Sequence, residues 1–289
     1  MGHPANLDDL SVLIDRALEE DVGTGDITTL WTIPADATTI GTFTSRFPGI
    51  ISGLNVAEQT FKRLDPDLVF QARIEDGDSV KPGVPFAQVQ GHTQSILTGE
   101  RTALNFLRHL SGIATLAERY AEAVSGTGTR VVDTRKTLPG FRSLEKRAVS
   151  HGGAGNHRFG LYDMILIKDN HIAAAGSITR AVNLCRHKMA ERNQPLKIEV
   201  EAESFPQVDE AARLGVDRIM LDNMSLDDMQ AAVEHVRAIA SLGDAIEIEA
   251  SGAITLDRVP EVAATGVDLI SIGALTHSVT ALDISLNIN

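Results

Sequence analysis

Short apolar runs recur along the second half of the chain, and each is followed by an amphipathic stretch of helical period. The runs are rich in β-branched residues and occupy residues 131–133, 164–167, 197–201, 218–221, 246–249 and 268–272. Ala-rich segments such as Ser225 to Ala240 lie between them. Alternation of buried strands with helices is typical of a parallel sheet. The pattern therefore predicts six βα units, arranged as a barrel or as an open doubly wound sheet.

Polar residues and glycines at the carboxyl ends of these predicted strands favour the barrel. They are Asp133, Lys168, Glu201, Asp222, Glu249, Ser251 and Gly273. Barrel active sites collect residues from the carboxyl ends of many strands, whereas an open sheet binds its ligand mainly near one switch point. No G-x-G-x-x-G motif follows an early strand, so a dinucleotide-binding fold loses its main support.

The first hundred residues have a different pattern, which predicts a smaller α+β domain. Stretches in which apolar and polar residues alternate predict strands at 38–47, 68–74 and 85–90. One amphipathic stretch predicts a helix at 54–64. A long helical segment follows, from Gln94 to Val124. We expect this segment to be broken or kinked near Ser111 and Gly112.

Basic residues are concentrated in one segment of an acidic chain. From Arg130 to Lys168 there are eight Arg or Lys against three Asp or Glu, whereas the whole chain of 289 residues has a formal net charge of −13. A duplex nucleic-acid surface needs many cations along one face, so this class of partner is excluded. The segment instead favours a small, multiply anionic ligand.

The remaining composition indicates a cytoplasmic protein. The single cysteine, Cys185, allows no intrachain disulfide, and no Cys/His spacing is typical of a structural zinc site. Residues 1–26 lack the pattern of a secretory signal. No run of about 18 apolar residues predicts a membrane-spanning helix.

Two loops of the basic segment are suited to anion binding. Arg135 and Lys136 are adjacent cations after a predicted strand, and a bound anion would relieve their repulsion; a solvated surface pair is the alternative. Residues 151–160, HGGAGNHRFG, combine four glycines with His157 and Arg158. Glycines let the backbone approach a ligand closely, and a flexible linker is the alternative.

Acidic residues and glycine loops follow later strands. Glu199 and Glu201 alternate along one strand and so face the same side, and Asp222 ends the next strand. Such carboxylates can hold Mg²⁺, bind sugar hydroxyls or stabilise a developing cation, or form a plain salt-bridge network. Residues 251–253 and 273–274 follow late strands and each leads into a helix, an arrangement that binds phosphate through backbone N–H groups.

Arg101 interrupts an apolar row of the long helix that includes Leu97 and Leu104. The methylene groups of its side chain could pack along the surface while the guanidinium group reaches water. Alternatively, its guanidinium is delivered to a carboxylate, within the subunit or across an oligomer interface.

A series of motifs along nearly the whole chain carries a family resemblance. In order they are GERTALNFLRHLSGIAT, DTRKTLPGFRSLEK, NHRFGLYDMILIKDNH, IEVE, LDN, EASG and IGALTHS. The series resembles the nicotinate-nucleotide pyrophosphorylase (carboxylating), or quinolinate phosphoribosyltransferase, family. A molybdenum-transport-associated relative, or another anion-binding protein on the same scaffold, is the alternative. A barrel aldolase that forms a Schiff base on Lys168 is a third interpretation.

The resemblance implies a fold and a reaction. The fold is an incomplete (open) α/β barrel over 111–278 and an N-terminal α/β sandwich domain over 1–110, which the C-terminal tail 279–289 joins. The reaction transfers phosphoribosyl from phosphoribosyl pyrophosphate to quinolinate with decarboxylation, giving nicotinate mononucleotide, pyrophosphate and CO₂ in de novo NAD biosynthesis. The resemblance also implies a homodimer in which Arg101 is contributed across the interface.

The resemblance assigns site residues in three groups. The quinolinate-binding positions are Arg101, Thr134, Arg135, Lys136, His157, Arg158 and Lys168. The positions for phosphoribosyl pyrophosphate are Lys136, Lys168, Glu201, Asp222, Ser251, Gly252, Ala253, Ile272, Gly273, Ala274 and His277. The expected catalytic residues are Glu201, Asp222 and Lys136. Mg²⁺ is expected mainly through substrate phosphates and water, with Glu201 and Asp222 as candidate direct ligands.

Overall fold

The computed structural model describes residues 7–240 and 245–288 and divides into two compact units. The first unit comprises Met1–Glu118, Thr137–Gly153 and Ala274–Asn289, and the second comprises Arg119–Lys136 and Ala154–Gly273. Residues 1–6 of the expected N-terminal domain and residue 289 of the expected tail lie outside the described residues.

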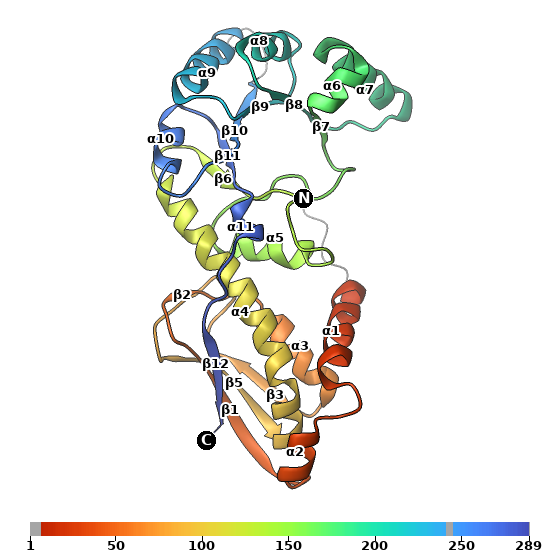
Figure 1. Ribbon diagram of the computed structural model, residues 1–289, viewed down its shortest axis with the longest axis vertical. Coiled ribbons are helices and arrows are strands. Elements are labelled where there is room, and N and C mark those ends of the chain that lie inside the picture. Colours follow the sequence, from red (N-terminus) through yellow and green to blue (C-terminus); the bar gives the residue numbers. More distant parts are fainter. Residues whose placement is uncertain (1–6, 241–244, 289) are drawn as a thin grey trace. The chain divides into compact units, whose positions relative to one another are not determined.

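A four-stranded antiparallel sheet with the order β12-β1-β5-β3 forms the centre of the first unit (Figure 1). Its strands are β1 (Thr38–Ser45), β3 (Val69–Ala72), β5 (Pro85–His92) and β12 (Ile284–Ile288). The short strands β2 (Gly49–Ile50) and β4 (Ser79–Val80) form a separate pair. The three strands predicted for the first hundred residues are confirmed. Strand β12 joins them from the far end of the chain, with Ile288 opposite Gly41.

Helices pack against this sheet through a phenylalanine-rich core. The helices of the first unit are α1 (Leu7–Val22), α2 (Ile27–Thr32), α3 (Leu54–Leu64), α5 (Arg142–His151), α11 (Ala274–His277) and most of α4 (Thr93–Ala123). Phe43 of β1, Phe61 of α3 and Phe86 of β5 are fully buried together in the core. Of the helices that the structure describes, none combines the length and the apolar character needed to cross a membrane.

The long helix α4 runs without a break through Ser111 and Gly112, so of the two expected features the break is wrong, and the kink stays a prediction. Ser111 Oγ accepts a hydrogen bond from the Ser52 backbone N–H at 3.0 Å. A Cβ atom on Gly112 would lie 2.4 Å from the carbonyl oxygen of Thr280. The two small residues therefore allow distant segments to approach the helix closely, and they do not interrupt it.

A six-stranded parallel sheet forms the second unit, in the order β6-β11-β10-β9-β8-β7 (Figure 1). The strands are β6 (Arg130–Val132), β7 (Ile165–Ile167), β8 (Ile198–Ala202), β9 (Arg218–Asp222), β10 (Glu247–Ser251) and β11 (Leu269–Ser271). The helices are α6 (Asp169–Ala175), α7 (Ile178–Arg192), α8 (Phe205–Arg213), α9 (Leu226–Ala240) and α10 (Val259–Ala264). All six predicted βα units are confirmed.

The strand order decides between the two predicted arrangements. From β7 to β11 each strand lies beside its successor in the chain, and β11 then pairs with β6. This is the cyclic order of a barrel that is opened between β6 and β7. A doubly wound sheet would reverse its strand order within the sheet. The open α/β barrel is therefore confirmed.

Candidate functional site

The carboxyl ends of the barrel strands carry most of the predicted polar residues. Asp133 and Lys168 directly follow β6 and β7, and Asp222 is the last residue of β9. Glu201 is the penultimate residue of β8. Because the carboxyl ends of parallel strands share one edge of the sheet, these side chains belong to the same end of the barrel. Glu249 is an exception: it lies in the middle of β10, so its predicted position at a strand end is wrong.

Lys168 and Glu201 form an ion pair between Nζ and Oε2. Lys168 caps the amino end of α6, and its backbone N–H donates to Nδ1 of His171 at 3.0 Å. The Lys168 side chain is 43% exposed, whereas that of Glu201 is 9% exposed. The structure thus places a solvent-accessible cation directly over a buried carboxylate at the barrel mouth.

Arg135 and Arg158 place two guanidinium groups in one half-buried region of the second unit. Burial lowers the pKa of Arg158, and the positive charge of Arg135 lowers it further. Arg158 Nη1 also donates to the carbonyl oxygen of Met164 at 3.1 Å. The charges of Glu199 and Asp163 act in the opposite direction and raise the pKa of Arg158. An anion bound beside the two guanidinium groups would further offset their repulsion.

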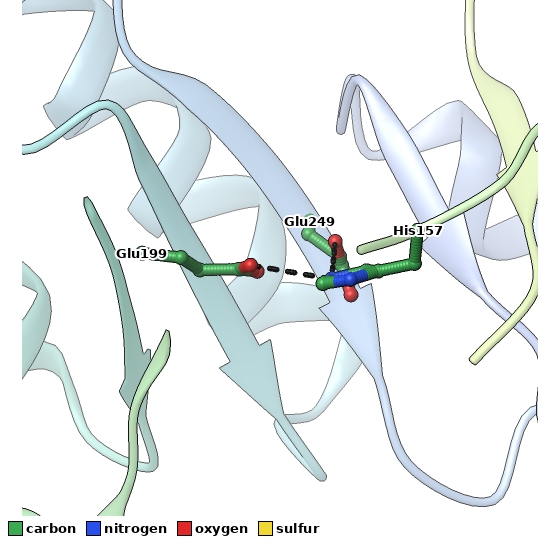
Figure 2. A group of neighbouring side chains, drawn as sticks. All are labelled: His157, Glu199 and Glu249. Atoms are coloured by element: carbon green, nitrogen blue, oxygen red, sulfur yellow. Dashed lines mark ion pairs between the residues drawn. The ribbon is translucent and has the colours of Figure 1, made fainter. Parts of the chain in front are cut away.

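A buried ionic cluster lies inside the barrel, beneath this edge. Figure 2 shows the His157 ring between the carboxylates of Glu199 and Glu249; Nε2 lies 3.2 Å from Oε2 of each. Both carboxylates are fully buried, and the His157 side chain is 6% exposed. Arg218 Nη1 lies 3.2 Å from Glu249 Oε2 and 3.8 Å from Glu199 Oε2. We call His157, Glu199, Arg218 and Glu249 the barrel-core cluster.

The barrel-core cluster retains protons. Burial alone would lower the pKa of His157, but hydrogen bonds to Glu199 and Glu249 outweigh it and raise that pKa to about 9. Burial and the neighbouring Glu249 charge raise the pKa of Glu199. Because these groups titrate together, the retained proton belongs to the cluster rather than to one residue.

Asp133 fixes the segment that carries His157. Its Oδ1 accepts the His157 backbone N–H at 2.9 Å, and its Oδ2 accepts Nδ2–H of Asn156 at 2.8 Å. The Asp133 N–H in turn donates to the Gly155 carbonyl oxygen at 3.1 Å. The loop is therefore tied to the end of β6 and is not a flexible linker.

The glycines of this loop serve contacts within the protein. A Cβ atom on Gly152 would lie 2.1 Å from the Ala114 carbonyl oxygen. The Gly155 N–H donates to the Val131 carbonyl oxygen at 2.8 Å. At these two positions the glycines allow close packing of the backbone within the protein, and the expected approach of this loop to a ligand stays a prediction.

The two glycine loops after late strands differ from one another. Gly273 leads directly into α11, as predicted. The loop that starts with Ser251, Gly252 and Ala253 also leads into a helix, but it is longer, and α10 begins at Val259. Gly252 has φ +123°, and a Cβ atom there would lie 2.4 Å from Asn223 Oδ1, so this turn requires glycine. The Ile272 N–H already donates to the Val132 carbonyl oxygen at 2.9 Å.

The remaining predicted site residues include exposed side chains and residues of the first unit. Thr134 Oγ1 accepts the backbone N–H of Lys136 at 3.1 Å, and the Lys136 side chain is exposed. Arg101 is exposed on α4, and Arg101, Ala274 and His277 belong to the first unit.

Sequence reasoning missed Arg218 and the role of Glu249. Both are charged residues at inward positions of strands, where apolar residues are expected. Glu199 pairs with Arg218 in register across β8 and β9. Charges of opposite sign at alternating positions of neighbouring strands were the signal that could have revealed the cluster.

Two models of known families match the chain. The model described as the N-terminal domain of quinolinate phosphoribosyl transferase matches residues 26–111, and the model of the C-terminal domain matches residues 113–287. Quinolinate phosphoribosyltransferase (decarboxylating) 1b of Nicotiana tabacum is 42% identical over 299 residues, which cover 100% of this chain and 84% of that protein. A probable nicotinate-nucleotide pyrophosphorylase (carboxylating) of Synechocystis is 44% identical over 275 residues, covering 95% and 91% of the two chains.

Solved structures are similar over the full length. NadC from Streptococcus pyogenes superposes with a TM-score of 0.91 at 36% identity, covering 100% of this chain and 99% of that one. The nicotinate-nucleotide pyrophosphorylase from Francisella tularensis has a TM-score of 0.92 at 35% identity, covering 99% and 98%.

Proposed function

The chain belongs to the quinolinate phosphoribosyltransferase family, and we propose that it transfers phosphoribosyl from phosphoribosyl pyrophosphate to quinolinate with decarboxylation, in de novo NAD biosynthesis. The products are nicotinate mononucleotide, pyrophosphate and CO₂. Both family models and the full-length relatives favour this enzyme over a non-catalytic anion-binding protein on the same scaffold.

The half-buried guanidinium pair is the observation that carries the substrate assignment. Burial and the charge of Arg135 both lower the pKa of Arg158, so an anion bound beside the two guanidinium groups would reduce their repulsion. Quinolinate is a dicarboxylate, and each guanidinium can hold one carboxylate with two parallel hydrogen bonds. Lys168 would add a third cation, and Thr134, Lys136 and His157 lie in the same chain segments.

The proposed catalysis consists mainly of stabilising the charges that develop on the two substrates during the reaction. As the ring nitrogen of quinolinate bonds to C1 of the ribose, the bond from C1 to pyrophosphate breaks and pyrophosphate takes the electron pair. Glu201 and Asp222 stabilise the positive charge that develops at C1, and Lys136 and Lys168 offset charge on the leaving group. The pyridinium then accepts the electron pair of the adjacent carbon–carboxylate bond, CO₂ leaves, and that carbon takes up a proton.

Glu201, which also pairs with Lys168, and Asp222 are the proposed ligands for Mg²⁺. Glu201 lies opposite Met220 in the parallel register, two residues before Asp222. Asp222 is half-buried, and its Oδ2 accepts Nδ2–H of Asn223 at 2.9 Å. Glu201 and Asp222 would hold Mg²⁺ through their carboxylate oxygens, which suit this cation. When bound, Mg²⁺ would neutralise charge on the departing pyrophosphate.

Loops after β10 and β11 are proposed to hold the 5′-phosphate. The residues are Ser251, Gly252, Ala253, Ile272, Gly273, Ala274 and His277. Strands β10 and β11 are neighbours, so their following loops start side by side at the barrel edge. Late-strand loops are the usual phosphate site of barrels.

A direct assay tests the proposed function. Purified protein is incubated with quinolinate, phosphoribosyl pyrophosphate and MgCl₂, and nicotinate mononucleotide is quantified by chromatography. We expect nicotinate mononucleotide and CO₂ to be formed in equal molar amounts. Folded protein that binds quinolinate but forms no nicotinate mononucleotide would support the anion-binding alternative instead.

We also propose a homodimer with shared sites, in which Arg101 of one subunit completes the quinolinate site of the other. Arg101 is exposed on α4, although its neighbours Ala103 and Leu104 are buried. An exposed arginine beside an apolar row suits delivery of a guanidinium across an interface.

Mixing two inactive variants tests this sharing. In a heterodimer of Arg101→Ala and Arg135→Ala subunits, one of the two sites contains no substitution. Random reassociation should therefore leave about a quarter of all sites without a substitution and restore about a quarter of the wild-type activity of the preparation, since half of the dimers are mixed. Absence of any recovery in dimers shown by mass spectrometry to be mixed would contradict shared sites.

The proposed compartment is the cytoplasm, on the basis of a single cysteine and no possible intrachain disulfide. Plant relatives carry chloroplastic or mitochondrial in their names, so compartment differs among members of the family.

A further inference from the structure

Residues 158–164 form an irregular turn that leads into strand β7, and Asp163 closes this turn. Its Oδ2 accepts the backbone N–H of Phe159 at 2.6 Å, and its Oδ1 accepts that of Gly160 at 2.8 Å. Hydrogen bonds from backbone N–H groups to a carboxylate are roughly twice as strong as those between neutral groups. Asp163 therefore restrains the backbone directly after Arg158, and we call residues 158–164 the Arg158 turn.

Apolar packing contributes less to the tip of the Arg158 turn. Leu161 and Tyr162 are exposed, at 73% and 57%. Within the turn, the Tyr162 ring lies over Gly160, since a Cβ atom on Gly160 would be 2.5 Å from Cε1 of Tyr162. Exposed segments with few buried apolar side chains open readily. The two hydrogen bonds to Asp163 are thus a major restraint on the conformation of this turn.

The side chain of Arg158 bridges the same turn. Its Nη1 donates to the carbonyl oxygen of Met164 at 3.1 Å, and Met164 is buried directly before β7. A guanidinium group has five N–H donors, and this contact uses one of them. The Arg158 turn therefore sets both the backbone position of residue 158 and the direction of its guanidinium group, while other donors of that group can bind a carboxylate.

The charge of Asp163 does not by itself favour the binding of an anion. Burial raises the pKa of Asp163, but hydrogen bonds from Gly160 and Phe159 and the positive charge of Arg158 outweigh burial and lower it, so the carboxylate is ionised at neutral pH. A negative charge near Arg158 repels a dicarboxylate and weakens its binding. Any gain in binding must come from the turn that Asp163 fixes. The two effects have opposite signs, so binding measurements separate them.

We propose that Asp163 is a positioning residue for quinolinate binding: by closing the Arg158 turn, it holds the guanidinium group of Arg158 where a carboxylate of quinolinate binds. The inference rests on the proposed function, because that function assigns Arg158 to quinolinate. Asp163 acts through two backbone N–H groups and not by contact with the substrate. Its effect is large because a guanidinium group binds a carboxylate through two parallel hydrogen bonds, which require a defined orientation.

Two substitutions of Asp163 separate position from charge. Asp163→Asn and Asp163→Ala both remove the charge, but asparagine keeps one oxygen that can accept a backbone N–H, whereas alanine keeps none. We expect calorimetric titration to show quinolinate bound about threefold more weakly by Asp163→Asn and about tenfold more weakly by Asp163→Ala, the size of a lost hydrogen bond to a charged group. An effect of charge alone predicts equal and tighter binding in both variants.

A double-mutant cycle tests whether Asp163 acts through Arg158. Asp163→Ala should lower kcat/KM for quinolinate about tenfold in the wild-type background but no more than about twofold in the Arg158→Gln background, where the guanidinium group is absent. KM for phosphoribosyl pyrophosphate should stay within about twofold in Asp163→Ala. Because Asp163 is exposed, we expect the variants to fold, which circular dichroism would check.

Asp78→Ala is the matched control. Asp78 is an exposed residue of the first unit, and its Oδ2 accepts the backbone N–H of Glu75 at 2.9 Å, across the same spacing of three residues that separates Asp163 from Gly160. This variant also loses one negative charge and one bond that closes a turn. Its kinetic constants for quinolinate should stay within about twofold of the wild type.

Several results would overturn the proposal. Unchanged or tighter quinolinate binding in both Asp163 variants would show that the turn does not position Arg158. An equal loss of kcat/KM in the wild-type and Arg158→Gln backgrounds, or a parallel rise of KM for both substrates, would show that Asp163 acts independently of Arg158. Failure of the proposed function is distinguishable, since the wild-type protein would then neither form nicotinate mononucleotide nor bind quinolinate.

Discussion

Replacement of Arg135 by glutamine should lower kcat/KM for quinolinate about a thousandfold, which corresponds to about 4 kcal/mol. Arg135 is half-buried, and its positive charge lowers the pKa of Arg158. Glutamine keeps polarity and much of the length but removes the charge and the two-pronged hydrogen bond to a carboxylate. One carboxylate of bound quinolinate would then lose its cation in a partly desolvated place.

Steady-state kinetics with each substrate varied in turn would measure the effect. KM for phosphoribosyl pyrophosphate should change much less than KM for quinolinate, because the loss concerns the dicarboxylate. Arg147→Gln is the matched control: Arg147 is an exposed arginine of α5 and should behave as the wild type. Near-normal quinolinate kinetics in Arg135→Gln would contradict the assignment of Arg135 to quinolinate.

The fold was largely predictable because its strands are short, apolar and separated by helices of clear period. All six barrel strands and the three early strands occur where the sequence pattern places them. Periodicity alone did not choose between a barrel and an open sheet. The polar residues at strand ends made that choice, since a barrel distributes its site around all the strands.

The errors arose where contacts between distant segments determine the local structure. Ser111 and Gly112 are residue types that often interrupt helices. In this protein Ser111 bonds to the Ser52 backbone, and Gly112 leaves room for the Thr280 carbonyl oxygen. The local sequence pattern contains no information about contacts with residues that are distant in the chain. Gly152 is a similar case, because Ala114, which packs against it, is far away in the sequence.

The candidate site was predictable where residues lie in loops and less so inside the barrel. Lys168 and Glu201, predicted from separate strand ends, form an ion pair. Arg218 was missed because a charged residue at the start of a strand ordinarily reaches solvent, whereas here it is enclosed by carboxylates from neighbouring strands. Glu249 was placed at a strand end because the carboxyl end of β10 was predicted two residues before its actual position at Ser251.

The barrel-core cluster should make the stability of the protein depend on pH. The pKa of His157 in the folded protein is about 9, above its ordinary value of 6.5, because Glu199 and Glu249 outweigh the effect of burial. A pKa raised on folding stabilises the protein fully below the ordinary value, and the contribution is lost as pH rises through the folded value. Of the other charged groups around the ring, Arg218 and Arg158 stay protonated in this range.

We therefore expect the free energy of unfolding to fall by up to about 3 kcal/mol between pH 6.5 and pH 9, from the difference between these two pKa values. Urea unfolding at several pH values would measure it. His157→Asn should have lower stability at pH 6.5 and a much flatter pH profile, since asparagine does not titrate. His92→Asn is the control, because His92 pairs with Asp65 with its side chain 51% exposed, and its removal should leave the slope intact. An equal slope in wild type and His157→Asn would mean that the cluster does not hold its extra proton in this range, since the buried carboxylates would then be compensated by Arg218 alone.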